Sequence, residues 1–125
     1  MKEKLLSLCL VSFLSGCAGV PTQQEVANAD YGVYPSSHES VVKNYYMMTL
    51  KDPASAQYQR VSNPQKTWLG NRIDGVTYGY LVCVTLNAKN SFGAYTGYQT
   101  DGLLIRNGKV AKYIEDGNWW GRQIC

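Results

Sequence analysis

Few side chains in this sequence have the types and spacing for acid–base or metal chemistry. His38 is the only histidine, and the acidic and sulfur-containing residues do not have the spacing of a zinc site. Asp101, Glu115 and Asp116 are carboxylates of the kind that hydrolases use in pairs. Asp101 and Asp116 each precede a glycine, however, and such pairs are typical of turns. We expect no catalytic residue, no metal and no cofactor, and we keep a hydrolase using Asp101 or Glu115 as the weakest alternative.

Two of the four cysteines, Cys83 and Cys125, are predicted to form a disulfide although they lie far apart in the sequence. Cys125 is the last residue, where a chain normally frays, so a bridge to Cys83 would hold it in place. A redox-active pair is the alternative, but the C-x-x-C spacing and a nearby histidine are missing. We expect a structural disulfide that stabilises the fold by about 4 kcal/mol in the chain-entropy model.

The densest polar segment runs from residue 87 to residue 97. Loops on a rigid scaffold often carry binding groups, and here amide, ammonium, hydroxyl and aromatic groups occur together. The candidate binding residues are Asn87, Lys89, Asn90, Ser91 and Tyr95. The alternative is structural: the asparagines cap turns, the glycines give backbone freedom and Phe92 fills the core. The sequence leaves both open.

Aromatic residues are frequent, with ten tyrosines, three tryptophans and two phenylalanines. Trp119 and Trp120 are adjacent, so both cannot point inward from an extended segment. We expect one to cover the sheet and the other to be exposed. Exposed tryptophans are common in protein interfaces, and they also stack on sugars. Trp119 and Trp120 therefore join the candidate binding residues, with Trp68 as a further possibility.

The pattern of apolar residues predicts one helix followed by a sheet. Spacings of three and four residues favour a helix over 37–51, started by a capping box between Ser36 and Glu39. Beyond Pro53 the period changes to two, which is typical of strands. The expected strands are 55–61, 65–69, 76–86, 98–106 and 109–114.

The strongest of these strands, 76–86, predicts how the layers are arranged. Val82, Val84 and Leu86 share one face, whereas Leu81 and Cys83 share the other with threonines. A disulfide at Cys83 would then draw the C-terminus across this second face. Asn107-Gly108 separates the last two strands and is a strong hairpin signal. We expect an α+β fold, with one N-terminal helix packed on an antiparallel sheet of four to five strands.

Length and charge limit the functional classes. The chain has 125 residues and a formal net charge of +3, enough for one small domain. It has no basic tract of the kind that binds nucleic acid, and no acidic tail. We therefore expect no nucleic-acid partner.

The N-terminus predicts export. An apolar run over 5–14 follows two lysines, and it is too short to span a bilayer, which takes about 20 residues. Leu14-Ser15-Gly16-Cys17 resembles the lipobox of bacterial lipoproteins. The resemblance implies cleavage before Cys17 and acylation of its thiol, and Ala18 in place of Asp resembles the outer-membrane pattern. The alternative is an ordinary secreted protein with a chance cysteine. We expect a signal peptide over 1–16, a lipidated flexible tether over 17–35 and one domain over 36–125.

Two further segments resemble a pattern shared by small, mostly uncharacterised exported proteins and lipoproteins of bacteria. They are Lys-Asp-Pro-Ala-Ser-Ala at 51–56 and Asn-Ala-Lys-Asn-Ser-Phe-Gly-Ala-Tyr at 87–95, after a strand that carries a cysteine. The chain departs from the pattern at Ala94, often glycine there, and at Thr85, often acidic. The resemblance implies a common domain but no activity and no catalytic residue.

Together these patterns favour a non-enzymatic outer-membrane lipoprotein on the periplasmic face. We expect it to bind another envelope protein through the 87–98 loop, with Trp68, Trp119 and Trp120 as further candidate contacts, in an accessory, masking or inhibitory role. The alternative is a peptidoglycan- or glycan-binding module that uses Trp119 and Trp120.

The intact mass of the full-length protein extracted from membranes tests the anchor and the bridge together. We expect loss of residues 1–16, added acyl mass, and a gain of about two mass units on reduction, because one disulfide opens. A soluble form without acyl mass would contradict the anchor. Free thiols at Cys83 and Cys125 would contradict the bridge.

Overall fold

The structure is a computed structural model that describes residues 19–125, so the expected signal peptide and Cys17 lie outside the described residues. It confirms the α+β class, with a five-stranded antiparallel sheet and a separate two-stranded one. None of the helices in this part of the chain is long and apolar enough to cross a membrane. In chain order the elements are α1 (Gln23–Asn28), α2 (His38–Thr49), the 3-10 turn η1 (Pro53–Ser55), β1 (Gln57–Val61), β2 (Gln65–Asn71), β3 (Gly75–Asn87), β4 (Gln99–Arg106), β5 (Lys109–Ile114), the 3-10 turn η2 (Glu115–Gly117), β6 (Asn118–Trp119) and β7 (Arg122–Gln123).

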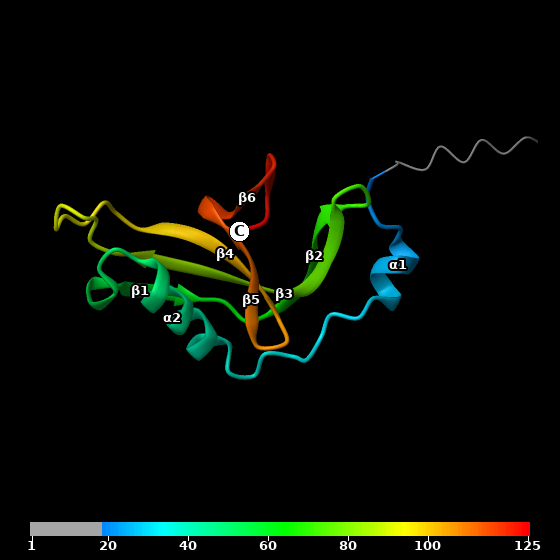
Figure 1. Cartoon of the computed structure of the whole chain (residues 1–125), viewed down its shortest axis with the longest axis horizontal. Helices are drawn as coiled ribbons and strands as arrows, with labels where there is room; N and C mark the ends of the chain where they lie inside the picture. Colours follow the sequence, from blue (N-terminus) through cyan, green and yellow to red (C-terminus); the bar gives the residue numbers. More distant parts are fainter. Residues whose placement is uncertain (1–18) are drawn as a thin grey trace, which may run out of the picture.

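The long strand β3 organises the sheet (Figure 1). Its 13 residues pair on one edge with two successive strands, β2 along its first half and β1 along its second. Its other edge pairs with β4, which pairs in turn with β5. Between β1 and β2, Ser62 continues the pairing because its amide donates to the Cys83 carbonyl at 2.9 Å. Its hydroxyl accepts a hydrogen bond from the Cys83 amide at 2.8 Å.

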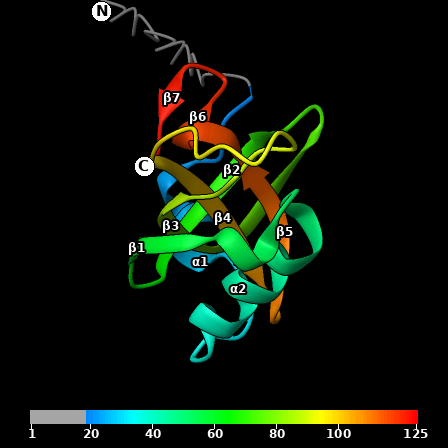
Figure 2. The ribbon, with the colours of Figure 1, turned by 90° about the vertical axis from the view of Figure 1, so that its left-hand side faces the viewer.

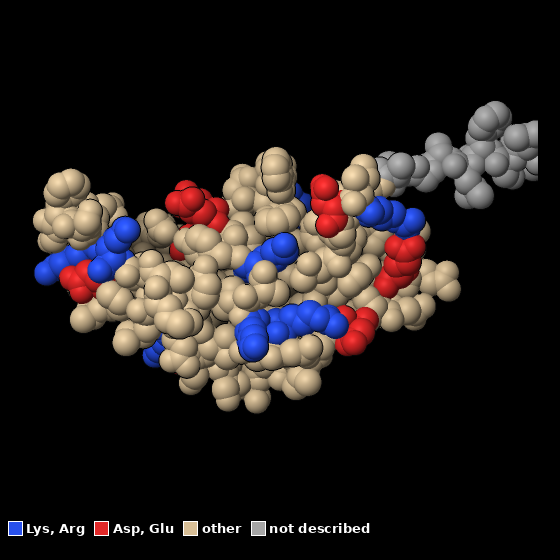
Figure 3. All heavy atoms as spheres, viewed as in Figure 1, with Lys and Arg blue, Asp and Glu red and all other residues tan. Residues whose placement is uncertain are grey.

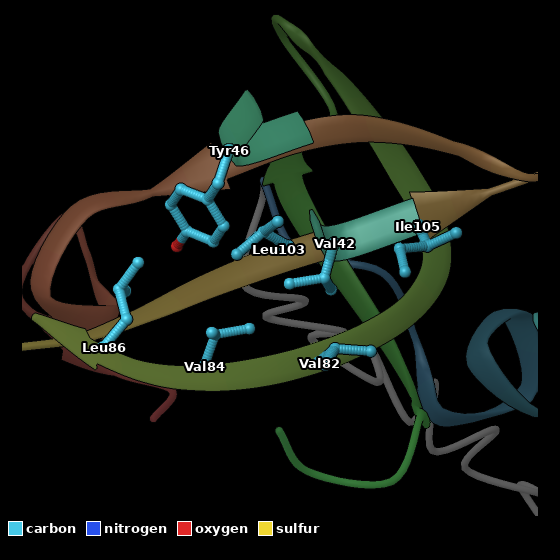
Figure 4. Packing of buried hydrophobic residues seen from close by; sticks show 7 residues of the cluster. All are labelled: Val42, Tyr46, Val82, Val84, Leu86, Leu103 and Ile105. Carbon is cyan, nitrogen blue, oxygen red and sulfur yellow. The ribbon is translucent and has the colours of Figure 1, made fainter. Parts of the chain in front are cut away.

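The two faces of β3 bury different layers, as the alternation predicts. Helix α2 lies on one face and the C-terminal hairpin of β6 and β7 lies on the other (Figures 1 and 2). On the helix side, Figure 4 shows the side chains of the main core converging between α2, β3 and β4: Val42, Tyr46, Val82, Val84, Leu86, Leu103 and Ile105. The smaller core on the opposite face contains Leu69, Leu81, Leu104 and Ile114, covered by Trp119 and Ile124.

The C-terminus is joined to the centre of the sheet, which confirms the expected pairing of cysteines. Cys83 on β3 and Cys125 form a disulfide with their Cα atoms 5.7 Å apart. Gly117 makes this approach possible, because a Cβ there would lie 2.6 Å from the Cys125 Cβ. Its φ of 63° also lies in the left-handed region that favours glycine. The last residues therefore cover the second face of the sheet, as expected from the position of Cys83.

The hairpin between β4 and β5 is also confirmed. Asn107 and Gly108 have φ angles of 50° and 77°, the left-handed conformations that a two-residue hairpin turn requires.

The expected start of α2 is wrong. The helix begins at His38, and Ser37 rather than Ser36 precedes it without a side-chain capping bond. The His38 amide instead donates to the Pro35 carbonyl at 3.1 Å, so a backbone turn satisfies the first donor. A capping box does occur earlier, where the Thr22 hydroxyl accepts from the Glu25 amide and the Glu25 carboxylate accepts from the Thr22 amide.

The expected flexible tether has regular structure and contacts the sheet in the part that the structure describes. It contains α1, and Tyr31 is buried with its ring 5.5 Å from that of Tyr78, centroid to centroid. Arg72 pairs with Glu25, and Arg106 pairs with Asp30 at 3.5 Å. Figure 3 shows basic and acidic side chains side by side at this end of the molecule. The polar composition of this segment suggested flexibility, but its described part makes specific aromatic and ionic contacts with the domain.

Replacing Cys83 and Cys125 together with Ala tests the contribution of the bridge. We expect the free energy of unfolding to fall by about 2–5 kcal/mol, because the unfolded chain regains the entropy that the cross-link removes. Urea unfolding with and without dithiothreitol measures this. The reductant should destabilise the wild type by a similar amount and leave the double variant unchanged. An equal response of both proteins to reductant would contradict the prediction.

Candidate functional site

The loop over residues 87–97 is held in one shape by its own asparagines. The Asn87 side-chain oxygen accepts from the Gly97 amide at 3.2 Å. The Asn90 side-chain oxygen accepts from the amides of Phe92 and Ala94, at 2.9 and 3.2 Å. Asn90 thus stabilises a turn, as the structural alternative predicts, whereas Asn87 joins the two ends of the loop. These roles leave their side-chain oxygens occupied within the loop.

The base of the loop is attached to η1. The Ser55 hydroxyl accepts from the Lys89 amide at 2.8 Å, and the Tyr95 hydroxyl donates to the Ser55 carbonyl at 2.8 Å. The Lys89 ammonium also lies 5.5 Å from the centroid of the Tyr95 ring. The two segments that carry the resemblance to exported proteins therefore meet in space at Ser55. Lys89 and Tyr95, predicted as binding residues, also act as structural contacts.

Phe92 lies at the exposed end of this loop. Its side chain is 93% exposed, so the expectation that it fills the core is wrong. Ser91 beside it is also exposed. The turn around Asn90 closes over only a few residues, which leaves the Phe92 ring outside. The exposed Phe92 ring thus lies on a loop whose backbone is fixed by hydrogen bonds to its own side chains.

A hollow of about 410 Å³ lies between this loop, the end of α2 and the start of η2. Lys51, Lys89 and Glu115 contribute charged groups to its lining. Leu50, Leu86, Ala88 and Thr96 contribute apolar or small side chains. Tyr46, Tyr113 and Asp101 also belong to the lining, as do the polar residues Thr49, Asn90 and Gln99. The hollow is therefore mixed in character, with an apolar part and groups of both charges.

Asp101 is the buried polar centre beneath this hollow. It lies inside β4 and is 0% exposed, so its interpretation as a turn residue is wrong. One carboxylate oxygen accepts from the hydroxyls of Tyr46 and Tyr113, each at 2.9 Å. The other accepts from the Asp116 amide at 3.1 Å, and the Gln99 amide group lies 3.1 Å from both oxygens. Donors thus surround the carboxylate and compensate for its loss of water.

The two tyrosines are held as hydrogen-bond donors. Burial raises the pKa of Tyr46 well above its usual value, and the adjacent Asp101 carboxylate raises this pKa further. Burial also raises the pKa of Tyr113, with a further contribution from its hydrogen bond to Asp101. Both hydroxyls therefore stay protonated at neutral pH and keep donating to Asp101.

The alternation of β4 contains the signal that identifies Asp101. Leu103 and Ile105 face α2, and counting back by two places Asp101 on the same face. Tyr46 and Tyr113 come from α2 and β5, so only the tertiary structure brings their hydroxyls to one carboxylate. These two tyrosines were not among the candidate site residues.

The structure does not bring the tryptophans to this loop. Trp119 and Trp120 line a different hollow of about 560 Å³, together with Trp68, Val20 and Arg122. Trp119 packs on the smaller core, whereas Trp120 is 91% exposed. This division confirms that one ring covers the sheet and the other is exposed. The candidate binding residues therefore form two separate surfaces.

The carboxylates near this hollow differ in accessibility. Both Asp101 oxygens already accept hydrogen bonds, and Glu115 is exposed. Among residues 19–125, no group of three His, Cys, Asp or Glu side chains is placed to hold a metal ion. Comparison with family models, with curated proteins and with solved structures finds no match to this chain.

Removing each tyrosine hydroxyl in turn tests the Asp101 cluster. We expect Tyr46→Phe to lower the free energy of unfolding by about 2–3 kcal/mol, because a buried charge loses a donor that water cannot replace. Tyr113 is 38% exposed, so water can take over its role, and Tyr113→Phe should cost about 1 kcal/mol. Urea unfolding at neutral pH measures both losses. Equal losses, or a larger one for Tyr113→Phe, would contradict this account.

Proposed function

We propose that this chain is a non-enzymatic lipoprotein, anchored through Cys17 at the periplasmic face of the outer membrane. Its domain binds another envelope protein through the 87–97 loop. The observation that carries the proposal is the Phe92 ring, which is 93% exposed on a loop whose backbone is fixed by side-chain hydrogen bonds.

The fixed shape of the loop favours binding. A flexible loop loses conformational freedom when a partner orders it, and that loss weakens the affinity. Here Asn90 holds a turn and Asn87 joins the two ends of the loop, while the Ser55 hydroxyl and carbonyl bind Lys89 and Tyr95 at its base. The loop is therefore already ordered before a partner arrives.

The surroundings of the loop suit a protein surface. Exposed aromatic rings often provide a large share of interface free energy. The adjacent hollow has room for a partner side chain, and Lys51, Lys89 and Glu115 in its lining offer charged contacts. Interfaces commonly have an apolar centre and a polar rim. Here the Phe92 ring would supply the apolar centre, and the charged residues of the adjacent hollow would supply polar contacts.

The alternative of a carboxylate-dependent hydrolase has less support. A general base must reach its substrate with a free oxygen, whereas Asp101 is buried and holds four donors. Glu115 is then left as the accessible carboxylate in the lining of this hollow, within the part of the chain that the structure describes. A single exposed carboxylate does not form the pair that such hydrolysis uses.

Site-specific photo-cross-linking in intact cells tests the proposed loop surface. A photoreactive phenylalanine analogue replaces Phe92, and in a matched protein it replaces Met48, which is 80% exposed on α2. We expect irradiation to give a discrete protein adduct from position 92 and none from position 48. An absence of adduct at position 92, or the same adducts from both positions, would contradict the proposal.

Once the adduct identifies the partner, Phe92→Ser tests the energetic role of the ring. We expect affinity for that partner to fall by about tenfold or more, because an aromatic anchor is lost. The melting temperature should not change, since the ring is exposed. Met48→Gln should change neither affinity nor stability. A variant Phe92→Ser that binds as tightly as the wild type would exclude the ring as an anchor.

A further inference from the structure

The first described residues are fixed to the body of the domain at the turn between β2 and β3. The Arg72 amide donates to the Gly19 carbonyl at 3.0 Å, and its guanidinium donates to the Val20 carbonyl at 3.2 Å. Arg72 also pairs with Glu25 of α1. Cys17 precedes Gly19 by two residues, a stretch that spans at most about 7 Å. An anchor at Cys17 would therefore attach directly beside this turn rather than at the end of a long flexible tether.

Large apolar side chains are exposed around the same point. Ile73 at the turn is 89% exposed, Trp120 is 91% exposed and Val20 is 47% exposed. Val20 and Trp120 line one hollow, together with Asp74 of the turn and with Asn71 and Gly75 on either side of it. Figures 1 and 2 both show the first described residues, the β2–β3 turn and the β6–β7 hairpin along one side of the molecule.

The backbone at Trp120 is itself unusual. Trp120 has a φ of 49° and Gly121 a φ of 84°, so the pair forms the turn between β6 and β7. Asn-Gly is the preferred sequence for such turns, and a bulky residue in the left-handed region is strained. The same turn type at the β4–β5 hairpin carries Asn107 and Gly108. Strain of this kind persists at functional positions, and here its effect is to present an indole ring to the outside.

Charge at this surface favours anionic headgroups. Lys112 and Arg122 line the hollow with one acidic residue, Asp74, while the charge of Arg72 is matched by Glu25. The Arg122 guanidinium lies 4.7 Å from the centroid of the Trp68 ring, which keeps it beside the apolar side chains. Tryptophan and basic residues are the side chains that prefer the membrane–water interface.

From the position of the anchor, the exposed apolar side chains and the charge, we infer that this end of the domain docks on the bilayer that holds the protein. The membrane-docking surface consists of Val20, Ile73 and Trp120, with Lys112 and Arg122 beside them. Trp120 and Ile73 enter the headgroup region, and the two cations contact anionic lipids. The inference rests on the proposed anchor at Cys17. It orients the domain so that the 87–97 loop lies away from this surface.

Quenching by brominated lipids tests the docking. The natively processed, full-length protein is placed in phosphatidylethanolamine and phosphatidylglycerol vesicles, with or without brominated acyl chains. We expect the wild type to lose about a third of its tryptophan emission in brominated vesicles, because one of its three indoles reaches the lipid. Trp120→Asn should lose almost none, and it should fold at least as well because it creates the preferred Asn-Gly turn.

A matched variant moves the exposed indole to the other end of the domain. The double variant Trp120→Asn and Phe92→Trp keeps three tryptophans, and its new indole replaces a ring of similar exposure. We expect it to be quenched no more than Trp120→Asn alone. Equal quenching of this variant and the wild type, or no quenching of the wild type, would overturn the docking.

Failure of the anchor is distinguished by separate measurements. Acyl mass and flotation with the vesicles report lipidation at Cys17, whereas quenching reports the orientation of the domain. Flotation without quenching would overturn the docking and leave the anchor intact. Protein without acyl mass would overturn both. Co-sedimentation with purified sacculi that is lost in Trp120→Asn would assign this surface to a glycan instead and overturn the docking.

Discussion

The arrangement of the helix side depends on one buried carboxylate. Asp101 receives hydrogen bonds from α2 through Tyr46, from β5 through Tyr113, from its own strand through Gln99 and from η2 through the Asp116 amide. A buried charge is tolerable only when donors surround it, so these elements must all adopt their positions together. The carboxylate thereby fixes where the helix ends relative to the sheet. The hollow beside the 87–97 loop takes its shape from that relation.

The loop residues and the tryptophans, which the sequence analysis placed in one set of candidate binding residues, lie near opposite ends of the strand β3. Its final residues lead into the 87–97 loop, and its first residues leave the turn that holds Gly19 and Val20. The disulfide joins the middle of this strand to the C-terminus, which places the β6–β7 hairpin on the face opposite α2. The strand β3 thus leads directly into the polar loop with the exposed ring, and the disulfide links it to the hairpin that carries Trp120. Under the proposed function the loop faces a protein partner, and under the further inference the surface around Trp120 faces the membrane.

The sequence was sufficient for features with local causes. Alternation predicted the strands and the two faces of β3, Asn107-Gly108 predicted its hairpin, and the position of Cys125 predicted the disulfide. The sequence was insufficient where tertiary contacts determine whether a helix is capped or a side chain is buried. The Ser-x-x-Glu pattern at residue 36 forms no cap, because α2 begins at His38 and Ser36 is therefore not its N-cap residue. The equivalent pattern at Thr22 does form a capping box, since Thr22 is the N-cap of α1. The structural alternative for the loop placed Phe92 in the core because of its residue type, and Asp101 was assigned to a turn because glycine follows it. The lipobox lies outside the described residues, so lipidation remains a prediction.

The division of one sheet edge between β1 and β2 has a consequence for self-association. An unbroken edge strand offers a continuous row of free backbone groups to another chain, which favours aggregation. Here the edge opposite β4 is interrupted at 62–64, where Ser62 turns its hydrogen bonds inward and Pro64 lacks an amide donor. Each remaining stretch is short, and Arg60 and Lys66 place charge on them. The same break that lets two strands share β3 thus discourages copies of this protein from pairing along this edge of the sheet.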